Sequence, residues 1–174
     1  MDSPTETLPA SQEATRHVSA LYQAHALALV RLAVLMTGDQ STAEDVVQDA
    51  FLGLYRRWQA LHDADKALGY LRSSVLNGCR SVHRVRFRRQ AVVLDAPGEA
   101  DSAEAEALLG EAHREVIVAL RRLPPRQREA VVLRYYLDMT EDQAAQAMGV
   151  SRGTVKSATH RGLAALARML KESQ

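Results

Sequence analysis

The chain has 174 residues but only one cysteine, Cys79, and few aromatic residues, which make up 5% of it. A single cysteine cannot form a disulfide within the chain. Long alternations of apolar and polar residues, the pattern of half-buried strands, are also missing. Hydrophobic residues nevertheless make up 47% of the sequence, an ordinary share for a globular protein. These features predict an all-α protein.

Two further absences concern membranes. The first residues, MDSPTETLPASQEA, are polar and acidic, unlike a signal peptide. The longest apolar run, Ala24 to Met36, is interrupted by His25 and Arg31, so no membrane-spanning helix is expected. The sequence therefore predicts a cytoplasmic protein with no membrane partner.

Motifs of catalytic and metal sites are missing as well. The sequence has no zinc motif, phosphate-binding loop, nucleophile elbow or convergent set of acid and base residues. Cys79 and His83 lie one helical turn apart, but two ligands do not make a zinc site. Cys79 fits better as a small buried residue. We therefore expect no enzymatic activity, no metal and no cofactor.

The charges that are present are unevenly distributed, although the net charge is only +1. Residues 1–90 carry 11 Lys and Arg against 9 Asp and Glu, and residues 113–174 carry 11 against 6. Residues 91–112 carry 6 acidic residues and no Lys or Arg. Two mildly basic segments thus flank an acidic one. This pattern predicts two domains that face nucleic acid, joined by a linker.

Apolar residues recur at helical spacing in most of the chain. The expected helices cover residues 13–37, 41–60, 68–87, 105–123 and 125–138, and a pair of short helices follows. Ser41 and Glu44 have the spacing of a capping box, which predicts that the second helix begins at Ser41. The remaining segments are expected to be a disordered tail (1–12), a polar loop (61–67) and a flexible linker (90–104).

The helix expected over residues 41–60 has two distinct faces. The buried face carries Ala43, Val46, Val47, Ala50, Phe51, Leu54 and Trp58. The opposite face carries Asp45, Gln48, Asp49, Leu52 and Arg56. An acidic patch with an exposed leucine fits a protein-binding face. From this helix alone, however, a solvated face with one stray leucine is the simpler interpretation.

The helix expected over residues 68–87 carries a row of polar and basic residues opposite its core face. The core face is Leu71, Val75, Cys79 and Val82, and the far side is Ser73, Asn77, Arg80, Arg84 and Arg88. The end of this helix, RVRFRR, is densely basic. Such a cluster is either a solvated helix end, whose cations suit the helix dipole, or a track for DNA phosphates. An amide and several guanidinium groups in one row favour the phosphate track.

The stretch from Thr140 to Leu163 has the pattern of two short helices with a tight turn. Thr140 and Gln143 form a capping-box pair, Gly149 suits the left-handed residue that ends a helix, and Ser151 can cap the next helix. The inward positions of the second helix are Val155, Ala158, Thr159 and Gly162. Its candidate DNA-binding residues are Arg152, Thr154, Lys156, Ser157, His160 and Arg161. This is the pattern of a helix-turn-helix that enters the major groove, and an ordinary helical hairpin is the alternative.

The order of these segments resembles the extracytoplasmic-function group of bacterial RNA polymerase sigma factors. AEDVVQDAFLGLYRRW resembles the polymerase-binding helix of that family, and GYLRSSVLNGCRSVHRVRFRR resembles its promoter-melting helix. LPPRQREAVVLRYYLDMTEDQAAQAMGVSRGTVKSATHRGL resembles its sigma4 domain. The resemblance covers nearly all of residues 18–170 and is nearest to the actinobacterial SigE-like group. It implies a sigma2 domain over residues 13–89 and a sigma4 domain over residues 113–174, with an acidic flexible linker at 90–112.

The resemblance also implies partners. Core RNA polymerase would be bound at the coiled coil of its largest subunit by Asp45, Gln48, Asp49 and Leu52. Sigma4 would contact the flap of the second-largest subunit. Promoter DNA would be the second partner, and an anti-sigma factor is a further candidate.

For promoter DNA, the resemblance assigns one element to each domain. The candidate helix-turn-helix residues would read the minus-thirty-five element. The residues matched to the minus-ten element are His62, Asp63, Lys66, Asn77, Arg80, Arg84 and Arg88. The loop from His62 to Lys66 would hold a base flipped out of the non-template strand. The melting helix has only Tyr70 and Phe87 for stacking on bases, so we expect weaker melting and stricter promoter choice than in primary sigma factors.

Two other classes of protein remain as alternatives. A conventional helix-turn-helix regulator would bind its operator without polymerase and would not need the face around Gln48. An enzyme would need a catalytic constellation, which the sequence lacks.

The sequence departs from the family at Ala158. The family often has a basic residue at this position, so one phosphate contact would be missing.

Overall fold

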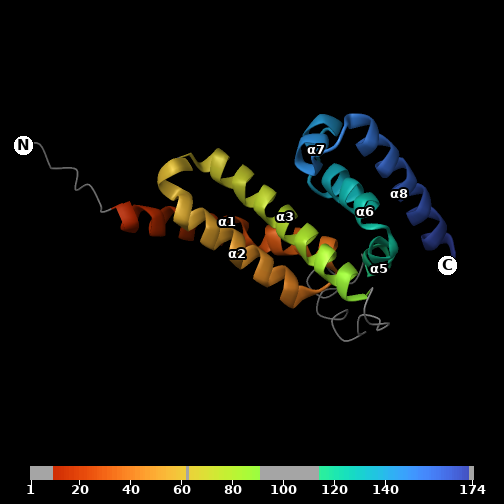
Figure 1. The fold of residues 1–174 in the computed structure, drawn as a ribbon, viewed down its shortest axis with the longest axis horizontal. Helices are drawn as coiled ribbons and strands as arrows, with labels where there is room; N and C mark the ends of the chain where they lie inside the picture. Colours follow the sequence, from red (N-terminus) through yellow and green to blue (C-terminus); the bar gives the residue numbers. More distant parts are fainter. Residues whose placement is uncertain (1–9, 62, 91–113, 173–174) are drawn as a thin grey trace, which may run out of the picture.

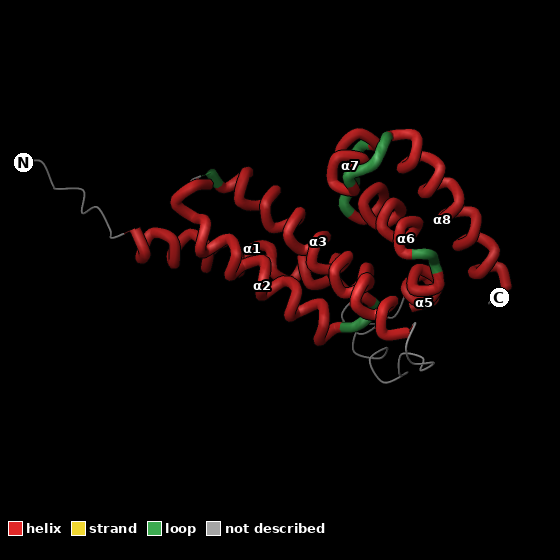
Figure 2. Tube along the Cα trace, in the orientation of Figure 1, coloured by secondary structure: helices red, strands yellow, loops and turns green. Residues whose placement is uncertain are grey.

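The computed structural model describes residues 10–61, 63–90 and 114–172, and all regular elements of this part of the chain are helices (Figures 1 and 2). Three long helices come first: α1 (Ala10–Thr37), α2 (Gln40–Leu61) and α3 (Ala64–Gln90). A second group comprises α5 (Arg114–Arg122), α6 (Pro125–Val131), the π-helix η2 (Val132–Tyr136), α7 (Glu141–Met148) and α8 (Arg152–Glu172). The expected all-α fold with two helical domains is confirmed.

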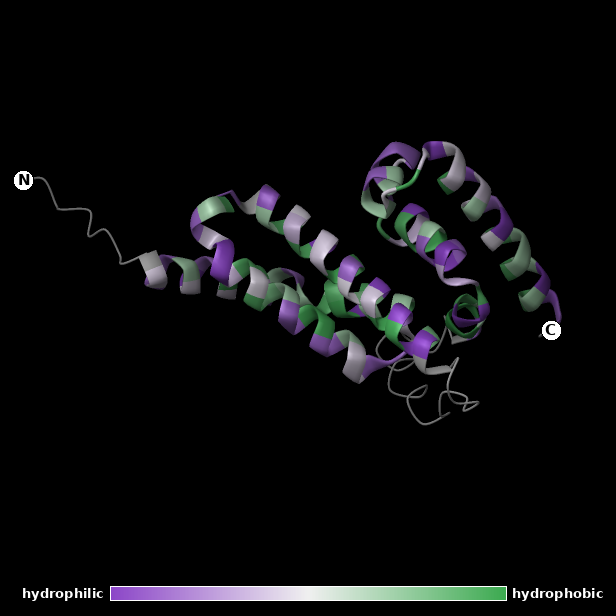
Figure 3. Cartoon of the chain, viewed as in Figure 1, coloured by the Kyte–Doolittle hydropathy of each residue, from purple (hydrophilic) through white to green (hydrophobic). Residues whose placement is uncertain are grey.

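The three long helices pack side by side around an apolar core. α1 contacts both α2 and α3, and α2 contacts α3. Leu32 and Met36 of α1, Leu54 of α2 and Leu71 and Leu76 of α3 are fully buried. Hydrophobic residues gather where the helices face one another, and hydrophilic residues lie on the outer sides (Figure 3). All seven residues expected on the inner face of α2 are buried, which confirms that prediction.

The start of α2 differs from the prediction. The capping box of Ser41 and Glu44 is wrong, because α2 begins at Gln40 and the Asp39 carboxylate accepts a hydrogen bond from the Thr42 backbone N–H at 2.9 Å. Burial alone would raise the pKa of Asp39. Hydrogen bonds from Thr42 and the positive charge of Arg86 outweigh that effect, so this pKa lies below its usual value. The Arg86 guanidinium of α3 is 3.4 Å from the carboxylate. A charged cap fixed by α3 therefore replaces the expected local one.

The start of α3 also differs. The polar loop expected over residues 61–67 is largely wrong, because α3 begins at Ala64. The backbone N–H of Ala67 donates to the Asp63 carbonyl at 2.9 Å, and Ala67 is fully buried. Burial of this alanine favours a helical turn over a loop in a stretch without Gly or Pro. Lys66 consequently lies on the first turn of α3.

Several predictions concern residues that are only partly described. Residues 10–12 belong to α1, so their assignment to a disordered tail is wrong. Residues 1–9, His62 and residues 91–113 lie outside the described residues, and with them most of the expected linker and the first half of the helix expected over residues 105–123. The rest of that helix is α5.

The second group begins with a turn at two prolines. α6 starts at Pro125, as its place at the first helical position predicts. The chain does not continue as an α-helix to Asp138, as expected, but widens into η2, where the Leu137 N–H donates to the Val132 carbonyl at 3.2 Å. Asp138 then takes a left-handed conformation with φ +50°, which ends the helical run. The residues expected to be buried here are buried or half-buried: Ala130, Leu133 and Leu137.

α1 is the most apolar of the three long helices. By length and composition alone, the segment from Ser11 to Thr37 is long and apolar enough to cross a membrane, contrary to the expectation from the sequence. Core helices of soluble proteins share this property. Here Leu32, Ala33, Val34 and Met36 are buried in the helical core.

The two groups of helices are in contact. α1 packs against α5, α6 and η2, and the second group lies beside the C-terminal half of α3 (Figure 1). Arg128 of α6 is buried and donates a hydrogen bond to the Met36 carbonyl of α1 at 2.7 Å. Arg80 of α3 forms an ion pair with Glu129 of α6. We call this the closed arrangement.

Candidate nucleic-acid interface

The outward face of α2 carries the residues expected to bind a protein. Asp45, Gln48, Asp49 and Leu52 are all exposed, with 49% of Leu52 accessible. Tyr55, three residues after Leu52, continues this face and is 42% exposed. The apolar part of the face is therefore larger than Leu52 alone. The spacing of Tyr55 from Gln48 and Leu52 could have revealed it in the sequence, because residues three, four and seven apart share a helix face.

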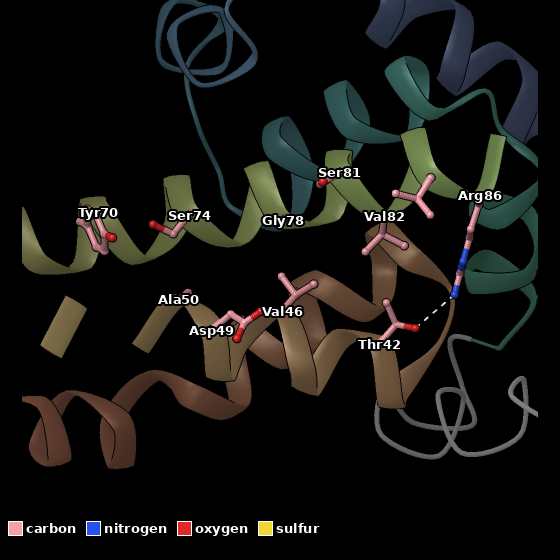
Figure 4. Close-up of a pocket in the computed structure, with 11 residues that line it drawn as sticks. Thr42, Val46, Asp49, Ala50, Tyr70, Ser74, Gly78, Ser81, Val82 and Arg86 are labelled. Atoms are coloured by element: carbon pink, nitrogen blue, oxygen red, sulfur yellow. Dashed lines mark hydrogen bonds between the residues drawn. The ribbon is translucent and has the colours of Figure 1, made fainter. Parts of the chain in front are cut away.

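A groove of about 660 Å³ runs between α2 and α3 (Figure 4). Asp49 lines it from α2, and Tyr70, Ser74 and Arg86 line it from α3. Asp49 thus lies at the edge between the outward face and the groove. The Tyr70 hydroxyl points toward α2, where a Cβ on Gly53 would lie 2.8 Å from it. Tyr70 is half-buried and lines the groove from α3.

The polar side of α3 is the first candidate DNA surface. Asn77, Arg84, Phe87 and Arg88 are exposed, and Phe87 is 74% accessible. At the other end of the helix, the Lys66 ammonium lies 4.0 Å from the Asp63 carboxylate. These residues follow α3 from its first turn to its last one. A basic row along one helix side is suited to a phosphate backbone.

Arg80 is the exception in this row. Its guanidinium donates to the Glu129 carboxylate through Nε at 2.9 Å and to the Ala147 carbonyl through Nη2 at 2.6 Å. Nη1 donates to the Asn77 side-chain oxygen at 2.8 Å. The closed arrangement therefore occupies the one arginine in the middle of the row. Arg80 lies on the side of α3 expected from the sequence, but no local pattern indicates a partner 49 residues away.

The helix-turn-helix is formed by α7 and α8, and its local signals are confirmed. Thr140 accepts from the Gln143 backbone N–H, and the Gln143 side chain accepts from the Thr140 N–H, which is a complete capping box. Gly149 ends α7 with φ +63°. The Ser151 hydroxyl accepts from the Thr154 N–H at 3.2 Å. These contacts fix the angle between the helices within a few residues of chain.

α8 packs closely on α6. Val155, Ala158 and Gly162 are buried as expected, and Thr159 is half-buried. A Cβ on Gly162 would lie 2.8 Å from Val131 Cγ2, so the helices approach too closely for a larger residue. α3 shows the same device, since a Cβ on Gly78 would lie 2.7 Å from Val46 Cγ1 of α2. Both α8 and α3 therefore pack closely on a neighbouring helix, α6 and α2 respectively, at a glycine that faces a valine.

The free side of α8 is the second candidate DNA surface. Lys156, Ser157, His160 and Arg161 are exposed. Thr154 is half-buried, and its hydroxyl is 2.9 Å from the Ser151 hydroxyl. The Arg161 Nε donates to the Ser157 carbonyl at 3.2 Å along the same helix. The expected side chains are therefore on one side of α8, with Thr154 at its margin.

Arg152 differs from the other residues of α8. Its Nε donates to the Glu141 carboxylate of α7 at 2.8 Å, and Asp142 lies 3.9 Å from its Nη1. The hydrogen bond from Arg152 lowers the pKa of Glu141. Arg152 is exposed and Glu141 is half-buried, so DNA phosphates can compete for Arg152.

Cys79 and His83 do not have the properties of metal ligands. Burial raises the pKa of the Cys79 thiol to about 12, so it stays protonated at neutral pH. Burial also lowers the pKa of His83, and its Nε2 is 2.8 Å from the Met36 carbonyl, which requires Nε2 to carry the proton. No group of three or more His, Cys, Asp or Glu that could hold a metal occurs in the described part of the chain.

A helix-turn-helix with an exposed basic side, packed against a bundle with a basic row of its own, defines a helical DNA-binding transcription factor. Comparison with known proteins identifies the family. Residues 21–91 match Sigma-70 region 2, and residues 113–166 match Sigma-70 region 4. The chain belongs to the extracytoplasmic-function (ECF) group of RNA polymerase sigma factors.

Relatives with curated names support this assignment. The chain is 35% identical over 140 residues to the RNA polymerase sigma-E factor of Streptomyces coelicolor. This match covers 80% of this chain and 77% of that protein. It is 32% identical over 159 residues to the ECF RNA polymerase sigma factor SigL of Mycobacterium tuberculosis, 88% of each chain. The expected resemblance to actinobacterial ECF factors is confirmed.

Solved structures show the same fold. The sigma factor RpoE in complex with the anti-sigma factor NepR from Bartonella quintana has a TM-score of 0.63 and 22% identity, covering 94% of this chain and 97% of that one. CnrH in complex with the cytosolic domain of CnrY has a TM-score of 0.66 and 22% identity, covering 94% and 96%.

Membership of this family defines the general role of the chain. It is an alternative sigma factor, which directs RNA polymerase to promoters, and the conventional helix-turn-helix regulator is not favoured. Sigma factors are transcription initiation factors.

Proposed function

We propose that this sigma factor binds core RNA polymerase through α2, recognises the minus-thirty-five element through α8, and helps to open DNA at the minus-ten element through α3. The division into a sigma2 domain at 13–89, a linker at 90–112 and a sigma4 domain at 113–174 belongs to the same proposal. The observation that carries it is the separation of three exposed surfaces onto three helices, of which one is acidic and apolar and two are basic.

The polymerase contact is assigned to the outward face of α2. Asp45, Gln48, Asp49 and Leu52 are exposed there while the other side of the helix is buried, so they are free to bind a partner. The partner would be the coiled coil of the largest polymerase subunit, and Tyr55 would extend the contact. Sigma4 would contact the flap of the second-largest subunit.

Recognition of the minus-thirty-five element is assigned to α8. Lys156, Ser157, His160 and Arg161 are exposed on one side of a helix that is rigidly capped and packed on α6. Arg and Lys can pair with guanine edges in the major groove, and Ser and His can donate or accept hydrogen bonds there. Arg152 and Thr154, near the N-terminus of α8, would contact the phosphate backbone.

Opening at the minus-ten element is assigned to α3 and the residues before it. Asn77 and Arg80 would face the non-template strand, and Arg84 and Arg88 would hold its backbone. Asp63 and Lys66, at the start of α3, would form the pocket for a flipped base together with His62. Because Lys66 lies on the helix, its position relative to the rest of α3 is fixed.

The remaining parts of the proposal concern regulation and location. RpoE and CnrH, which share this fold, are solved with NepR and with the cytosolic domain of CnrY. We infer that an anti-sigma factor also holds this protein inactive. We place it in the cytoplasm, where polymerase is found, and assign it no catalytic activity and no cofactor.

Reconstituted transcription tests the proposal. Purified protein and core polymerase should together start transcription from a promoter of the native genome where neither does so alone. Gln48→Ala combined with Asp49→Lys should weaken binding to core polymerase by about tenfold or more, because both residues lie on the proposed contact and a central interface residue is worth about 2 kcal/mol or more. Arg57→Ala is the matched control, because Arg57 is also exposed on α2 but lies outside this face. Unchanged affinity of the double variant, with normal helicity, would remove this face from the proposal.

A further inference from the structure

The closed arrangement buries a charged residue on α6 that no proposed contact with polymerase or DNA uses. Glu129 is only 6% exposed, and a buried carboxylate needs a partner because its desolvation is unfavourable. Its partner is Arg80, which donates through both Nε and Nη2 to the same carboxylate oxygen. A residue of the second group is thus stabilised by a residue of α3.

Arg80 makes further contacts that keep it in this position. Nη2 also donates to the Ala147 carbonyl near the end of α7, at 2.6 Å. Nη1 donates to the Asn77 side chain, one turn earlier on α3. Every nitrogen of the guanidinium therefore has an acceptor within the protein. Asn77 and Arg80, the two residues assigned above to the non-template strand, are both engaged.

A groove of about 700 Å³ lies between α3 and the second group. Arg84, Phe87 and Arg88 line it from α3, and Arg126 and Met148 line it from α6 and α7. The second group therefore covers the polar side of α3 in part: Arg80 is held by it, whereas Arg84, Phe87 and Arg88 line the groove and stay exposed. At Arg80, a DNA strand laid along this side of α3 would need the place that Glu129 and Ala147 of the second group occupy.

We propose that Arg80 and Glu129 form an autoinhibitory latch, which holds the second group over the polar side of α3 in the free protein and so prevents this side from binding single-stranded DNA. The functional part of this proposal rests on the proposed role of α3 at the minus-ten element. Binding to polymerase would separate the two groups and release Arg80 for DNA.

The energetics of the pair suit a latch that opens. Removing one partner from a buried ion pair leaves an unpaired charge, which is costly, but separating the two groups exposes both charges to water. Hydration then offsets much of the lost attraction, so opening requires little free energy. The interface around the pair adds the Arg128 contact to Met36, which holds the groups together without involving the DNA-facing row. Interfaces between domains of one chain open readily unless they are large and hydrophobic.

The test uses the full-length protein without polymerase and two variants of Glu129. Glu129→Ala removes the acceptor of the Arg80 hydrogen bonds. Glu129→Gln removes the charge but keeps the shape of the buried side chain, so this variant is expected to fold even if Glu129→Ala does not. Glu115→Gln is the matched control, because Glu115 is an exposed carboxylate at the start of α5. Circular dichroism verifies that helicity is retained.

Two quantities are measured for each protein. The first is the radius of gyration from small-angle X-ray scattering. The second is the affinity for a fluorescent single-stranded oligonucleotide that carries the non-template strand of a promoter transcribed by the holoenzyme. We expect both Glu129 variants to have a larger radius of gyration than the parent and to bind the oligonucleotide roughly fivefold or more tightly, in the range of coupling between sites in other proteins. The Glu115 variant should match the parent in both.

Two results would overturn the latch. The first is an unchanged radius of gyration in both Glu129 variants with normal helicity. The second is an expanded protein whose affinity for the oligonucleotide is unchanged, since the pair would then not mask α3. Transcription by wild-type protein with core polymerase is scored separately, so failure of the proposed function is distinguishable from failure of the latch.

Discussion

The helices α3 and α8 are built alike but differ in what their polar sides contact. Each packs on a neighbouring helix through a glycine: Gly78 of α3 faces Val46 of α2, and Gly162 of α8 faces Val131 of α6. Each carries basic residues on the opposite side. On α8, Lys156 and His160 are exposed, whereas on α3 Arg80 is held by Glu129 and Ala147 of the second group. Within one chain, the surface proposed to read duplex DNA is open and the one proposed to hold opened DNA is partly covered.

This difference separates two steps of promoter use. A surface that reads duplex DNA can be open at all times, because non-specific binding through a few phosphates is weak at physiological salt. A surface that holds single-stranded DNA is needed only after polymerase has bound. Covering it until then keeps the free factor from binding single strands elsewhere.

The largest expected effects concern the two glycines. Gly78→Ala and Gly162→Ala should each destabilise the protein by about 1–3 kcal/mol, because a Cβ would overlap a branched valine side chain in a packed core. Urea unfolding followed by circular dichroism measures this loss. Gly69→Ala on α3 and Gly153→Ala on α8 are the matched controls, since a Cβ meets no atom within 4 Å at Gly69 and only Ser151 Oγ at 3.9 Å at Gly153. If all four variants were equally stable, the close packing of both helices would be refuted.

The next effect separates reading from opening. Arg161→Ala should lower promoter occupancy by holoenzyme and relax the preference for one base pair of the minus-thirty-five element by about 1–3 kcal/mol. Asn77→Ala should leave that preference intact and reduce the fraction of complexes with permanganate-reactive thymines near the start site. Footprinting and permanganate reactivity on one promoter measure both. A loss of occupancy alone in both variants would mean that α3 and α8 do not have separate roles.

A third effect compares two arginines with different surroundings. Arg84 on α3 is exposed, whereas Arg152 on α8 is already paired with Glu141. Arg84→Ala should therefore reduce the slope of log affinity against log salt by about 1 for promoter binding by holoenzyme. Arg152→Ala should change the slope less, because its contact with DNA replaces an existing ion pair. Equal slopes for Arg84→Ala and the parent protein would exclude Arg84 from contact with a phosphate.

The smallest effect compares the caps of α2 and α7. Asp39→Ala and Thr140→Ala should each reduce stability at pH 7 by about 1 kcal/mol. The pKa of Asp39 is lower in the folded protein than its ordinary value of 3.8, so its contribution is complete above that value and is lost as pH falls through the folded pKa. The destabilisation by Asp39→Ala should thus shrink in acid, whereas that by Thr140→Ala should persist. Urea unfolding between pH 3 and pH 7 distinguishes them, and parallel curves for the two variants would contradict a charged cap at Asp39.

A feature could be predicted from the sequence when the residues that determine it lie close together along the chain. The capping box at Thr140, the left-handed Gly149 and the cap at Ser151 depend on residues within a few positions, so local patterns were sufficient. The inner face of α2 was equally predictable, because helical periodicity alone defines it. The choice of Asp39 over Ser41 as the cap was not, since Arg86 of α3 contributes to it.

The same reasoning explains the misses at the candidate site. Arg80 and Glu129 look like ordinary surface charges in the sequence, and only the packing of α6 beside α3 pairs them. The π-helix after α6 was missed because no local residue pattern distinguishes it from a continued α-helix. Tyr55, by contrast, lies seven residues after Gln48 and three after Leu52, so helical spacing alone is sufficient to place it on the α2 face.

The Met36 carbonyl, in the last turn of α1, limits which sigma4 domains can be exchanged between relatives. The Met36 carbonyl accepts hydrogen bonds from His83 of α3 and Arg128 of α6, so one helix end receives donors from both groups. A helix-turn-helix transplanted from a relative would keep its promoter preference through α8 alone. It would rest against α1 in the same orientation only if its own residue at the place of Arg128 could reach that carbonyl. Exchange of promoter specificity between relatives is therefore constrained by a residue far from any base.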